Sequence, residues 1–361
     1  MNYYIVTHYW DYATLRNSNV KGRDDIFEQW NRIGLSPIEI GWIDDGRREG
    51  LLRRIRKQFE ILGAWKKSLS PVRSGDVLVF HNPPSKRFMF YPKIIKEQKR
   101  KGAKIILQIF DMDSVIRLWP RMLRPLMIVI NEYVERSIYK SADVIIAHNE
   151  TMKKQLLSMG VSGDKIILHY AFDYLESNPM KEVRRDKAGA AIFAGNLEVN
   201  KAGFVYDLPD NFRFNLYGPG YEECNQKDNV EFKGVYKASE LFDHIEGSYG
   251  LVWGGSTSDI CRGNWGRALK YENPHKASMY LAAGLPLIVY REAGIGDFVR
   301  ETGCGIFIDS LYDINEVVKK LTQEEYDVMQ ENAVRIGNML RSGEMSDKVF
   351  REALRMAGAE V

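Results

Sequence analysis

The chain has 361 residues, of which 45% are hydrophobic and 27% charged, a balance typical of a globular protein large enough for two domains. Its formal net charge is +3, and the sequence holds neither a run of about 18 apolar residues nor a signal-peptide pattern, which argues against membrane-spanning and secreted classes. The three cysteines are scattered, with no CxxC pair or histidine cluster, so nothing indicates structural zinc.

Short apolar runs alternate with amphipathic stretches through the first half of the chain. We expect helices near 24–33, 48–69, 92–101, 120–140 and 150–159, between strands at 4–6, 38–40, 77–80, 105–109, 144–147 and 166–169. Buried strands separated by helices form a parallel sheet with helices on both faces. Such doubly wound sheets bind ligands at the carboxyl ends of their strands.

A second series of the same kind follows a polar, proline-containing stretch at 171–188, which suits a linker. Its strands are predicted at 190–194, 212–217, 230–232, 250–253, 287–290 and 305–308. The fold class is therefore α/β, with two Rossmann-like doubly wound domains. We place the first at 1–178 and the second at 189–340, followed by a terminal helix, 341–361, that crosses back to the first domain.

The stretch YENPHKASMYLAAGLPLIVY, residues 271–290, predicts a helix followed by a buried strand. Asn273 is a suitable N-cap, Pro274 suits the first helical position, and Gly284 ends the helix. The unpaired N–H groups at such a helix start, together with Lys276 on the first turn, attract a phosphate group. An ordinary helix–strand unit with a solvent-facing lysine is the alternative.

Glycine, aromatic or polar residues follow four strands of the second series, and such residues would line a single crevice at the strand ends. They are Gly195, Asn196, Lys201, Tyr217, Gly218, Val235, Tyr236 and Trp253. A basic stretch at 262–270 is expected to be a loop that either covers a diphosphate or is an exposed connector. The chain has no GKS or GKT, so it lacks a P-loop.

In the first half, Asp111 and Asp113 directly follow the strand predicted at 105–109. Three interpretations stay open. The pair is a DxD motif that binds a divalent metal with a diphosphate, or one carboxylate is a base for an acceptor hydroxyl, or Asp113 caps a helix that starts at Ser114. The long polar loop 8–25 is typical of segments that bind a substrate or move.

Several of these motifs resemble those of GT-B glycosyltransferases. Pro274, Lys276 and the string YLAAGLP at 280–286 resemble their donor-binding helix, and Asn273, His275 and Ser278 narrow the resemblance to one group. That group comprises bacterial glucosyltransferases that extend N-acetylglucosamine on serine-rich adhesins, and related galactofuranosyltransferases of surface polysaccharides. The strings HNETM at 148–152, FDYL at 172–175 and GNL at 195–197 are similar too, so the resemblance covers nearly the whole chain.

The resemblance implies a GT-B fold, whose two domains face an interdomain cleft, and a UDP-sugar donor whose diphosphate lies at the helix around Lys276. It implies transfer of glucose or galactofuranose to a hydroxyl of a glycan or lipid-linked glycan, without metal or cofactor. Asp111 would be the base and Asp113 a cap or substrate ligand. The implied acceptor-side residues are His8, Lys21, Asp25 and Arg117.

Two departures from the family pattern are Phe110, where the family has histidine, and Met279, where many GT-B enzymes carry a ribose-binding glutamate. They keep open a non-catalytic GT-B-fold subunit that serves a partner transferase, beside a metal-dependent DxD transferase. Family relatives form homo-oligomers, so we expect one here.

Basic residues are concentrated at 51–104, which holds 15 basic and 3 acidic side chains. Such a face suits an anionic membrane or a lipid-linked diphosphate, while a solvated helix face is the alternative. Nucleic-acid-binding motifs are absent from the sequence, so no nucleic-acid partner is expected. The predicted location is the cytoplasm, at the inner face of the membrane.

Overall fold

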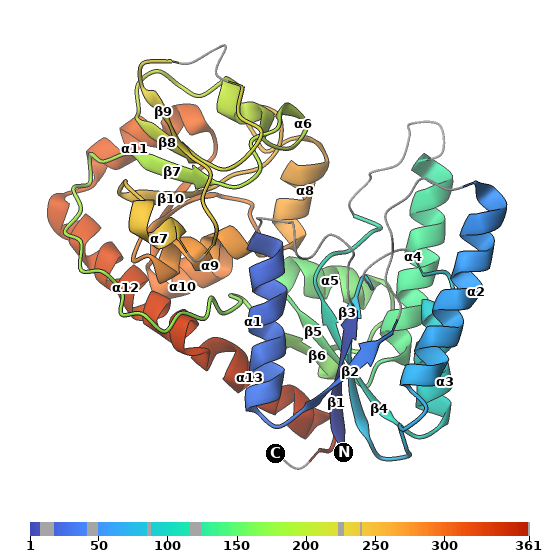
Figure 1. The fold of residues 1–361 in the computed structure, drawn as a ribbon. Coiled ribbons are helices and arrows are strands. Elements are labelled where there is room, and N and C mark those ends of the chain that lie inside the picture. The colour runs from blue at the N-terminus through green and yellow to red at the C-terminus, as the bar shows by residue number, and fades with distance from the viewer. Residues whose placement is uncertain are drawn as a thin grey trace. The chain divides into compact units, whose positions relative to one another are not determined.

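The structure is a computed structural model that describes residues 1–7, 18–41, 50–84, 88–115, 124–222, 227–238 and 240–359. Contacts divide the chain into two compact units (Figure 1). Unit 1 comprises Met1–Leu15, Ile26–His169 and Ser346–Val361, and unit 2 comprises Arg16–Asp25 and Tyr170–Met345. Each unit is built on a parallel six-stranded sheet.

The sheet of unit 1 has the strand order β2-β1-β3-β4-β5-β6. Every residue of β3 and β5 is buried, as the continuous apolar runs of a two-sided sheet predict. The strands are β1 (Asn2–Thr7), β2 (Ser36–Ile40), β3 (Val77–Asn82), β4 (Lys104–Ile109), β5 (Val144–Ala147) and β6 (Ile166–Leu168).

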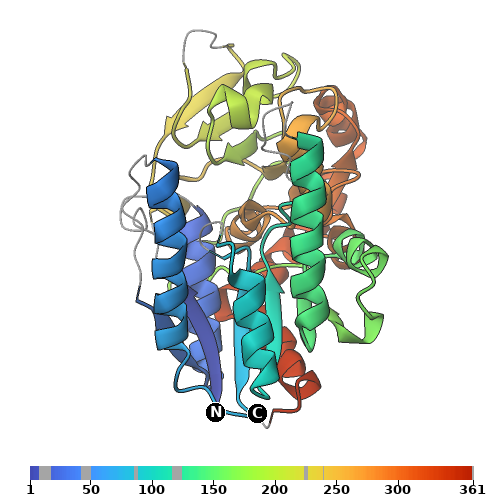
Figure 2. The ribbon, with the colours of Figure 1, turned by 90° about the vertical axis from the view of Figure 1, so that its right-hand side faces the viewer.

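Helices cover both faces of this sheet. The helices of unit 1 are α2 (Leu51–Ser68), α3 (Tyr91–Arg100), α4 (Arg124–Ser141), α5 (Glu150–Ser158), η1 (Gly163–Lys165) and α13 (Glu344–Met356), with the later part of α1 (Ser18–Arg32). Figure 2 looks onto α2, α3 and α4, which lie in front of the sheet. On α13, Phe350 stacks on Trp30 of α1 with ring centroids 3.8 Å apart, so the chain's last helix completes the core of unit 1.

The sheet of unit 2 has the order β12-β11-β10-β7-β8-β9. Its strands are β7 (Ala191–Ala194), β8 (Phe214–Tyr217), β9 (Val230–Gly234), β10 (Tyr249–Val252), β11 (Leu287–Tyr290) and β12 (Gly305–Ile308). All four residues of β7, β8, β10 and β11 are buried. Because the strands are parallel, their carboxyl ends share one edge of the sheet.

The helices of unit 2 are α6 (Val199–Ala202), η2 (Gly203–Tyr206), α7 (Leu241–His244), α8 (Gly263–Tyr271), α9 (His275–Ala282), α10 (Gly296–Thr302), η4 (Leu311–Asp313), α11 (Ile314–Lys320) and α12 (Gln323–Ser342). A capping box of Thr322 and Glu325 starts α12, and Gly343, at φ 92°, ends it. Near that end, Arg341 donates to the carbonyl of Ala282 at 2.8 Å and so satisfies a carbonyl at the end of α9.

The structure confirms the predicted strands and corrects one detail of organisation. The stretch 262–270, expected to be a loop, is mostly the helix α8, because Gly266, Ala268 and Leu269 are buried while basic side chains alternate with them. The chain leaves unit 1 after His169 in the division by contacts, and the domain boundary at 178 stays a prediction. The segment that follows is already part of unit 2, since Tyr174 N–H donates to the carbonyl of Leu340 at 3.1 Å.

Among the described helices, none combines the length and apolar character needed to cross a bilayer.

Candidate donor site and candidate base

The start of α9 carries no side-chain cap. Pro274 is the N-cap residue, so the helix begins at His275. The prediction that Asn273 caps this helix is wrong, because the Asn273 side chain is buried and its Nδ2 donates to the carbonyl of Tyr170 at 2.6 Å. The first N–H groups of a helix have no partner within the helix, so an uncapped start suits an anion.

Lys276 lies on the first turn of α9, at the carboxyl end of β7. Its Nζ sits 3.8 Å from the centroid of the Phe193 ring, and a Cβ built on Gly195 would lie 3.7 Å from the same atom. Within the described part of the chain, no acidic side chain forms an ion pair with Lys276. Burial lowers the pKa of Lys276 to about 7, and nearby Cys261 opposes that shift. A desolvated lysine without a protein counterion is suited to binding an anionic ligand.

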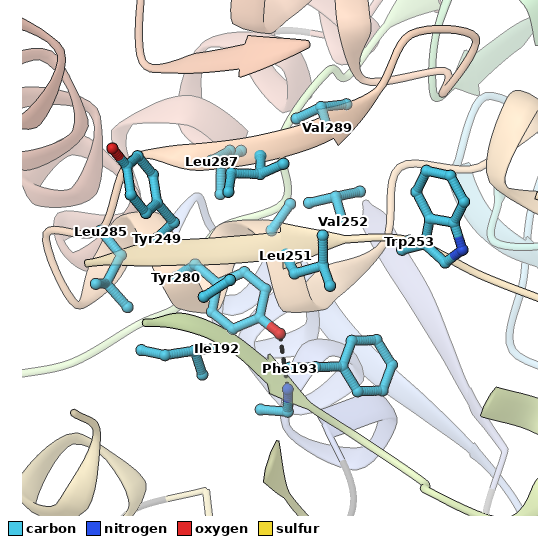
Figure 3. Packing of buried hydrophobic residues seen from close by; sticks show 14 of the residues in the cluster. Ile192, Phe193, Tyr249, Leu251, Val252, Trp253, Tyr280, Leu285, Leu287 and Val289 are labelled. Atoms are coloured by element: carbon cyan, nitrogen blue, oxygen red, sulfur yellow. Dashed lines mark hydrogen bonds between the residues drawn. The ribbon is translucent and has the colours of Figure 1, made fainter. Parts of the chain in front are cut away.

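Tyr280 fixes α9 against the sheet. Figure 3 shows its hydroxyl next to β7, where it accepts a hydrogen bond from the N–H of Ala194 at 2.8 Å. Tyr280 is fully buried, and a buried tyrosine hydroxyl needs a polar partner. Because Ala194 is the last residue of β7, this bond sets Lys276, one turn earlier on α9, against the end of that strand.

Glycines form the neighbouring edge of the sheet. Gly195 N–H donates to the carbonyl of Tyr217 at 2.9 Å, and Gly218 N–H donates to that of Gly234 at 2.9 Å. Gly218 has φ 127°, which side-chain-bearing residues rarely adopt, and a Cβ there would lie 1.9 Å from the carbonyl oxygen of Gly195. Gly218 therefore lets the ends of β7 and β8 pack closely, and Gly195 leaves bare backbone beside Lys276.

Three predicted donor-binding residues have side chains that hold this edge together. The Tyr217 hydroxyl donates to the carbonyl of His244 at 3.0 Å, and the Tyr236 hydroxyl donates to that of Lys233 at 2.9 Å. Trp253 is buried, and its indole N–H donates to the carbonyl of Thr257 at 3.0 Å. These three side chains hold neighbouring loops in place. Direct contacts with a ligand would therefore come from other atoms of the same segments.

The remaining predicted residues of unit 2 differ in accessibility. Asn196 accepts a hydrogen bond from the N–H of Glu198 at 2.9 Å, which shapes the turn after β7. Lys201 is exposed, with its Nζ 5.7 Å from the ring centroid of Trp265 on α8. Val235 is exposed, whereas Ser278 is buried within α9. Trp265 thus joins the candidate site, which favours the first of the two interpretations of residues 262–270, a segment beside the diphosphate.

His275 is half-buried beside the early part of α1. Its Nε2 lies 3.2 Å from the carbonyl oxygen of Asp173, and its ring centroid lies 5.3 Å from that of Tyr174. A Cβ built on Gly22 would lie 2.8 Å from the imidazole ring. Burial lowers the pKa of His275 to about 4, so the ring is neutral at pH 7. This placement favours a role in positioning α9.

Lys21 and Asp25 belong to unit 2, and their predicted role on the acceptor side stays a prediction. Lys21 Nζ lies 2.9 Å from Asp25 Oδ1 and 2.8 Å from the carbonyl oxygen of Leu175, while Asp25 Oδ2 accepts from the N–H of Leu175 at 3.1 Å. Burial raises the pKa of Asp25 to about 6. The pair fastens the early part of α1 to the segment 174–175. The other predicted acceptor-side residues, His8 and Arg117, lie outside the described residues.

Asp111 and Asp113 lie in unit 1, half-buried, in the turn after β4. The carbonyl of Asn82, at the end of neighbouring β3, accepts from the N–H groups of Phe110 at 2.7 Å and of Asp111 at 3.3 Å. Phe110 stacks on His81, with ring centroids 5.1 Å apart. Residues 113–115 form a turn, so the helix expected to start at Ser114 is not seen in the described residues.

Glu135 of α4 supports this turn, and sequence reasoning missed it. Its carboxyl group accepts hydrogen bonds from both the N–H and the hydroxyl of Ser114. Glu135 is buried, and burial raises its pKa to about 7. No local pattern could have identified it, because its role depends on the packing of α4 against the end of β4.

The described ranges hold no group of three or more His, Cys, Asp or Glu side chains that could bind a metal ion. The expectation of metal-independent chemistry therefore stays a prediction.

Two doubly wound units, each built on a parallel six-stranded sheet, define the GT-B fold. Solved structures of that fold are similar along the chain. Anabaena HepE in complex with UDP has a TM-score of 0.60 at 10% identity, covering 98% of this chain and 100% of that one. WaaG, a glycosyltransferase of lipopolysaccharide biosynthesis, has a TM-score of 0.56 at 13% identity, covering 99% and 100%.

The chain belongs to the glucosyltransferase 3-like family, whose N-terminal domain model matches residues 2–170 and whose C-terminal domain model matches residues 191–353. The beta-1,6-galactofuranosyltransferase WbbI of Escherichia coli K12 is 30% identical over 301 residues, covering 79% of this chain and 81% of WbbI. Glucosyltransferase 3 of Streptococcus gordonii is 28% identical over 289 residues, with the same coverage. The protein is a glycosyltransferase.

Proposed function

We propose that the protein transfers a hexosyl group, glucose or galactofuranose, from a UDP-sugar to a hydroxyl of a glycan acceptor during synthesis of a cell-surface polysaccharide or glycoprotein. Similarity to WbbI and to glucosyltransferase 3 supports both candidate sugars. Structures of Anabaena HepE with UDP and with UDP-glucose, which share the fold, support a UDP-sugar donor. The observation that carries the proposal is Lys276, a desolvated lysine beside an uncapped helix start.

In this proposal the donor's diphosphate binds between the start of α9 and the glycine edge of β7 and β8. The positive end of the helix dipole and the ammonium of Lys276 both stabilise the charge that develops on the leaving group. The missing side chain at Gly195, next to the Lys276 ammonium, leaves room for the diphosphate there. With this charge neutralisation supplied by the protein, we propose a metal-independent reaction.

The reaction exchanges one bond for another at the anomeric carbon. The acceptor oxygen forms a bond to C1 of the sugar as the bond from C1 to the β-phosphate oxygen breaks, and the electron pair leaves with UDP. The acceptor hydroxyl loses its proton in the same step, and Asp111 is the proposed base. Glu135 and Asn82 hold the turn that carries it.

The proposal also covers the cellular location, the acceptor and the oligomeric state. We propose a cytoplasmic enzyme at the inner face of the membrane, which acts on a glycan or lipid-linked glycan and forms a homo-oligomer. The basic composition of residues 51–104 supports the membrane contact, and the family resemblance supports the oligomer.

A panel of nucleotide sugars tests the donor. Any ligand that binds only the folded state raises the melting temperature, and at 100 times its Kd the gain is about 2.7 kcal/mol. We expect UDP-glucose or UDP-galactofuranose, and UDP itself, to raise the melting temperature, and nucleotide sugars with other bases to do so less. A panel in which no uridine nucleotide shifts the transition contradicts the donor assignment and favours a non-catalytic subunit.

Substitution of the proposed base tests the chemistry. Asp111→Asn keeps the size of the side chain but accepts no proton, so transfer should fall by at least about a hundredfold while the UDP-induced shift persists. Asp164→Asn, an exposed change in unit 1, is the matched control. Transfer by Asp111→Asn at the wild-type rate would place the base elsewhere. Loss of wild-type transfer in EDTA would instead favour the metal-dependent DxD reaction.

A further inference from the structure

The first half of α2 exposes apolar side chains to solvent. Leu52 is 83% exposed and Phe59 is 59% exposed, and Ile55 between them is exposed as well. Their spacing of three and four residues places them on one face of the helix. Other residues of α2, such as Ile61 and Trp65, are buried and pack into the core of unit 1. The exposed stripe is therefore separate from the face of α2 that packs into the core.

The loop before α3 extends the stripe. Met89 is 74% exposed, and its N–H donates to the Gln58 side chain of α2 at 2.9 Å. The ring of neighbouring Phe90 lies 5.3 Å from that of Phe59. We call Leu52, Ile55, Phe59 and Met89 the α2 surface. A cluster of large exposed apolar side chains on a globular protein marks an interaction site.

Basic residues interleave with this cluster. Arg53, Arg54 and Arg56 are exposed on the same turns of α2, which carries six basic side chains and a single acidic one, Glu60. Glu60 pairs with Arg56 at 3.0 Å, so the net charge of the helix surface stays strongly positive. Large apolar side chains flanked by arginine and lysine are the composition of helices that lie in the interface of an anionic bilayer.

A second helix on the same face of the sheet has a similar stripe. On α4, Leu126, Val129 and Tyr133 are exposed at the same three-and-four spacing, Tyr133 by 75%. Both helices follow parallel strands, so both begin at the carboxyl-end edge of the sheet. Asp111 lies at the same edge, because it follows the end of β4. A tyrosine at the rim of an apolar stripe suits the boundary between lipid and water.

We propose that the α2 surface docks on an anionic lipid bilayer, with the exposed stripe of α4 as a second point of contact. The inference builds on the membrane-side location in the proposed function and gives it a surface and a lipid class. It also narrows the acceptor. A bilayer held at the edge that carries Asp111 presents lipid-linked glycans to that edge, so the lipid-linked class is the one this placement serves.

Flotation with lipid vesicles tests the docking. The full chain should float with vesicles of phosphatidylglycerol and phosphatidylcholine far more than with phosphatidylcholine alone, and less as salt is raised, because surface charge is screened. The variant Leu52→Ser/Ile55→Ser/Phe59→Ser should lower the partition coefficient by at least about tenfold. Arg53→Glu/Arg54→Glu should lower it too and weaken its salt dependence.

Matched controls alter exposed residues elsewhere. Leu157→Ser/Val183→Ser/Val328→Ser removes three exposed apolar side chains, and Lys319→Glu/Lys320→Glu reverses two exposed charges on α11; neither should change vesicle binding. An unchanged melting temperature and UDP-induced shift would show that the α2 variants fold. Those shifts test donor binding separately, so failure of the donor assignment and failure of docking give different results.

Two outcomes overturn the proposal. The first is that the wild-type protein does not bind anionic vesicles, or that the α2 variants bind them as well as the control variants do. The second is a wild-type oligomer, measured by light scattering, that the α2 variants convert to monomer while vesicle binding is absent. That result would make the surface an interface between copies of the chain.

Discussion

At the scale of single residues, the donor assignment rests on Lys276, because the desolvation of its ammonium group makes the charged form less favourable in the folded protein. Burial lowers its pKa to about 7, and in the described residues no carboxylate offsets that burial. A lysine kept only for stability would be paired or solvated. Groups whose pKa is shifted by desolvation are concentrated at functional sites, where a ligand supplies the missing partner.

Replacing Lys276 with methionine should separate stability from binding. Lys276→Met keeps the shape of the side chain and removes a half-buried charge, so the unliganded protein should gain up to about 1 kcal/mol of unfolding free energy. UDP-sugar binding should weaken by about 1–3 kcal/mol, because a charge-assisted contact is lost. Thermal unfolding and calorimetry measure the two effects. A less stable variant with wild-type affinity would contradict the assignment.

The pH dependence of binding provides a second measurement on the same residue. A diphosphate beside Lys276 stabilises the ammonium and raises its pKa above the value of about 7 that it has without ligand. Binding above pH 7 must therefore take up a proton, and affinity should fall by up to about tenfold per pH unit until the bound-state pKa is reached. Below pH 7 this residue adds no pH dependence. Lys276→Met should remove the fall.

At the scale of elements, the contact between α1 and α9 depends on Gly22. Alanine in place of an exposed helical glycine normally stabilises a helix by about 0.5–1 kcal/mol. At Gly22 the added Cβ would lie 2.8 Å from the His275 ring, so we expect the opposite sign. Gly22→Ala should lower the unfolding free energy by about 1–3 kcal/mol and weaken UDP-sugar binding, since His275 adjoins Lys276 on α9.

Gly63 of α2 is the matched control, because a Cβ there would meet no atom within 4 Å. Gly63→Ala should raise the melting temperature and leave UDP-sugar affinity unchanged. Equal stabilisation by both substitutions would show that His275 yields to α1 freely and that this contact does not position α9.

The sequence predicted the strands better than the helix boundaries. β5, β11 and β12 have their predicted bounds, because a short buried strand in a parallel sheet is a continuous apolar run with little alternative. α8 was missed because its apolar residues are few and small, with Gly266 among the buried positions. The cap of α9 was misassigned because Asn273 bonds to a residue distant in sequence, Tyr170, which local propensity cannot show.

The candidate site was predictable where the chemistry lies within one segment. Lys276 and the glycines after β7 and β8 follow from helix-start and strand-end patterns. Glu135, Gly22 and Trp265 do not, because their roles arise from contacts between elements far apart in the chain. A glycine within a helix, or an acid on an amphipathic helix, has the same appearance in sequence whether or not a distant element packs on it.

At the scale of the whole molecule, five desolvated titratable groups act in opposite directions as the pH falls. Burial lowers the pKa of His148 and His275 to about 4 and that of His169 to about 3. Burial also raises the pKa of Asp25 to about 6 and that of Glu135 to about 7. Near pH 5, the unfolded chain therefore binds more protons at the three histidines, and the folded chain binds more at the two carboxyl groups.

Near pH 5, the extra protons that unfolding adds at the histidines outnumber those that it releases from the two carboxyl groups by about one. The unfolding free energy should therefore fall by roughly 1.4 kcal/mol per pH unit as the pH drops through 5. Stability from the histidines is complete above their unfolded pKa of about 6.5 and is lost toward pH 4. The carboxyl groups oppose that loss, because below their folded pKa they stay protonated in the folded state while the unfolded chain is still ionised.

Two substitutions should change this slope in opposite directions. His169→Gln removes one histidine term and should bring the slope near zero, whereas Glu135→Gln removes one carboxyl term and should about double it. Denaturant unfolding between pH 4.5 and 6 measures both, and His148→Gln replaces His169→Gln if loss of the contact with Ser346 prevents folding. If both buried variants keep the wild-type slope, acid sensitivity arises from groups other than these five.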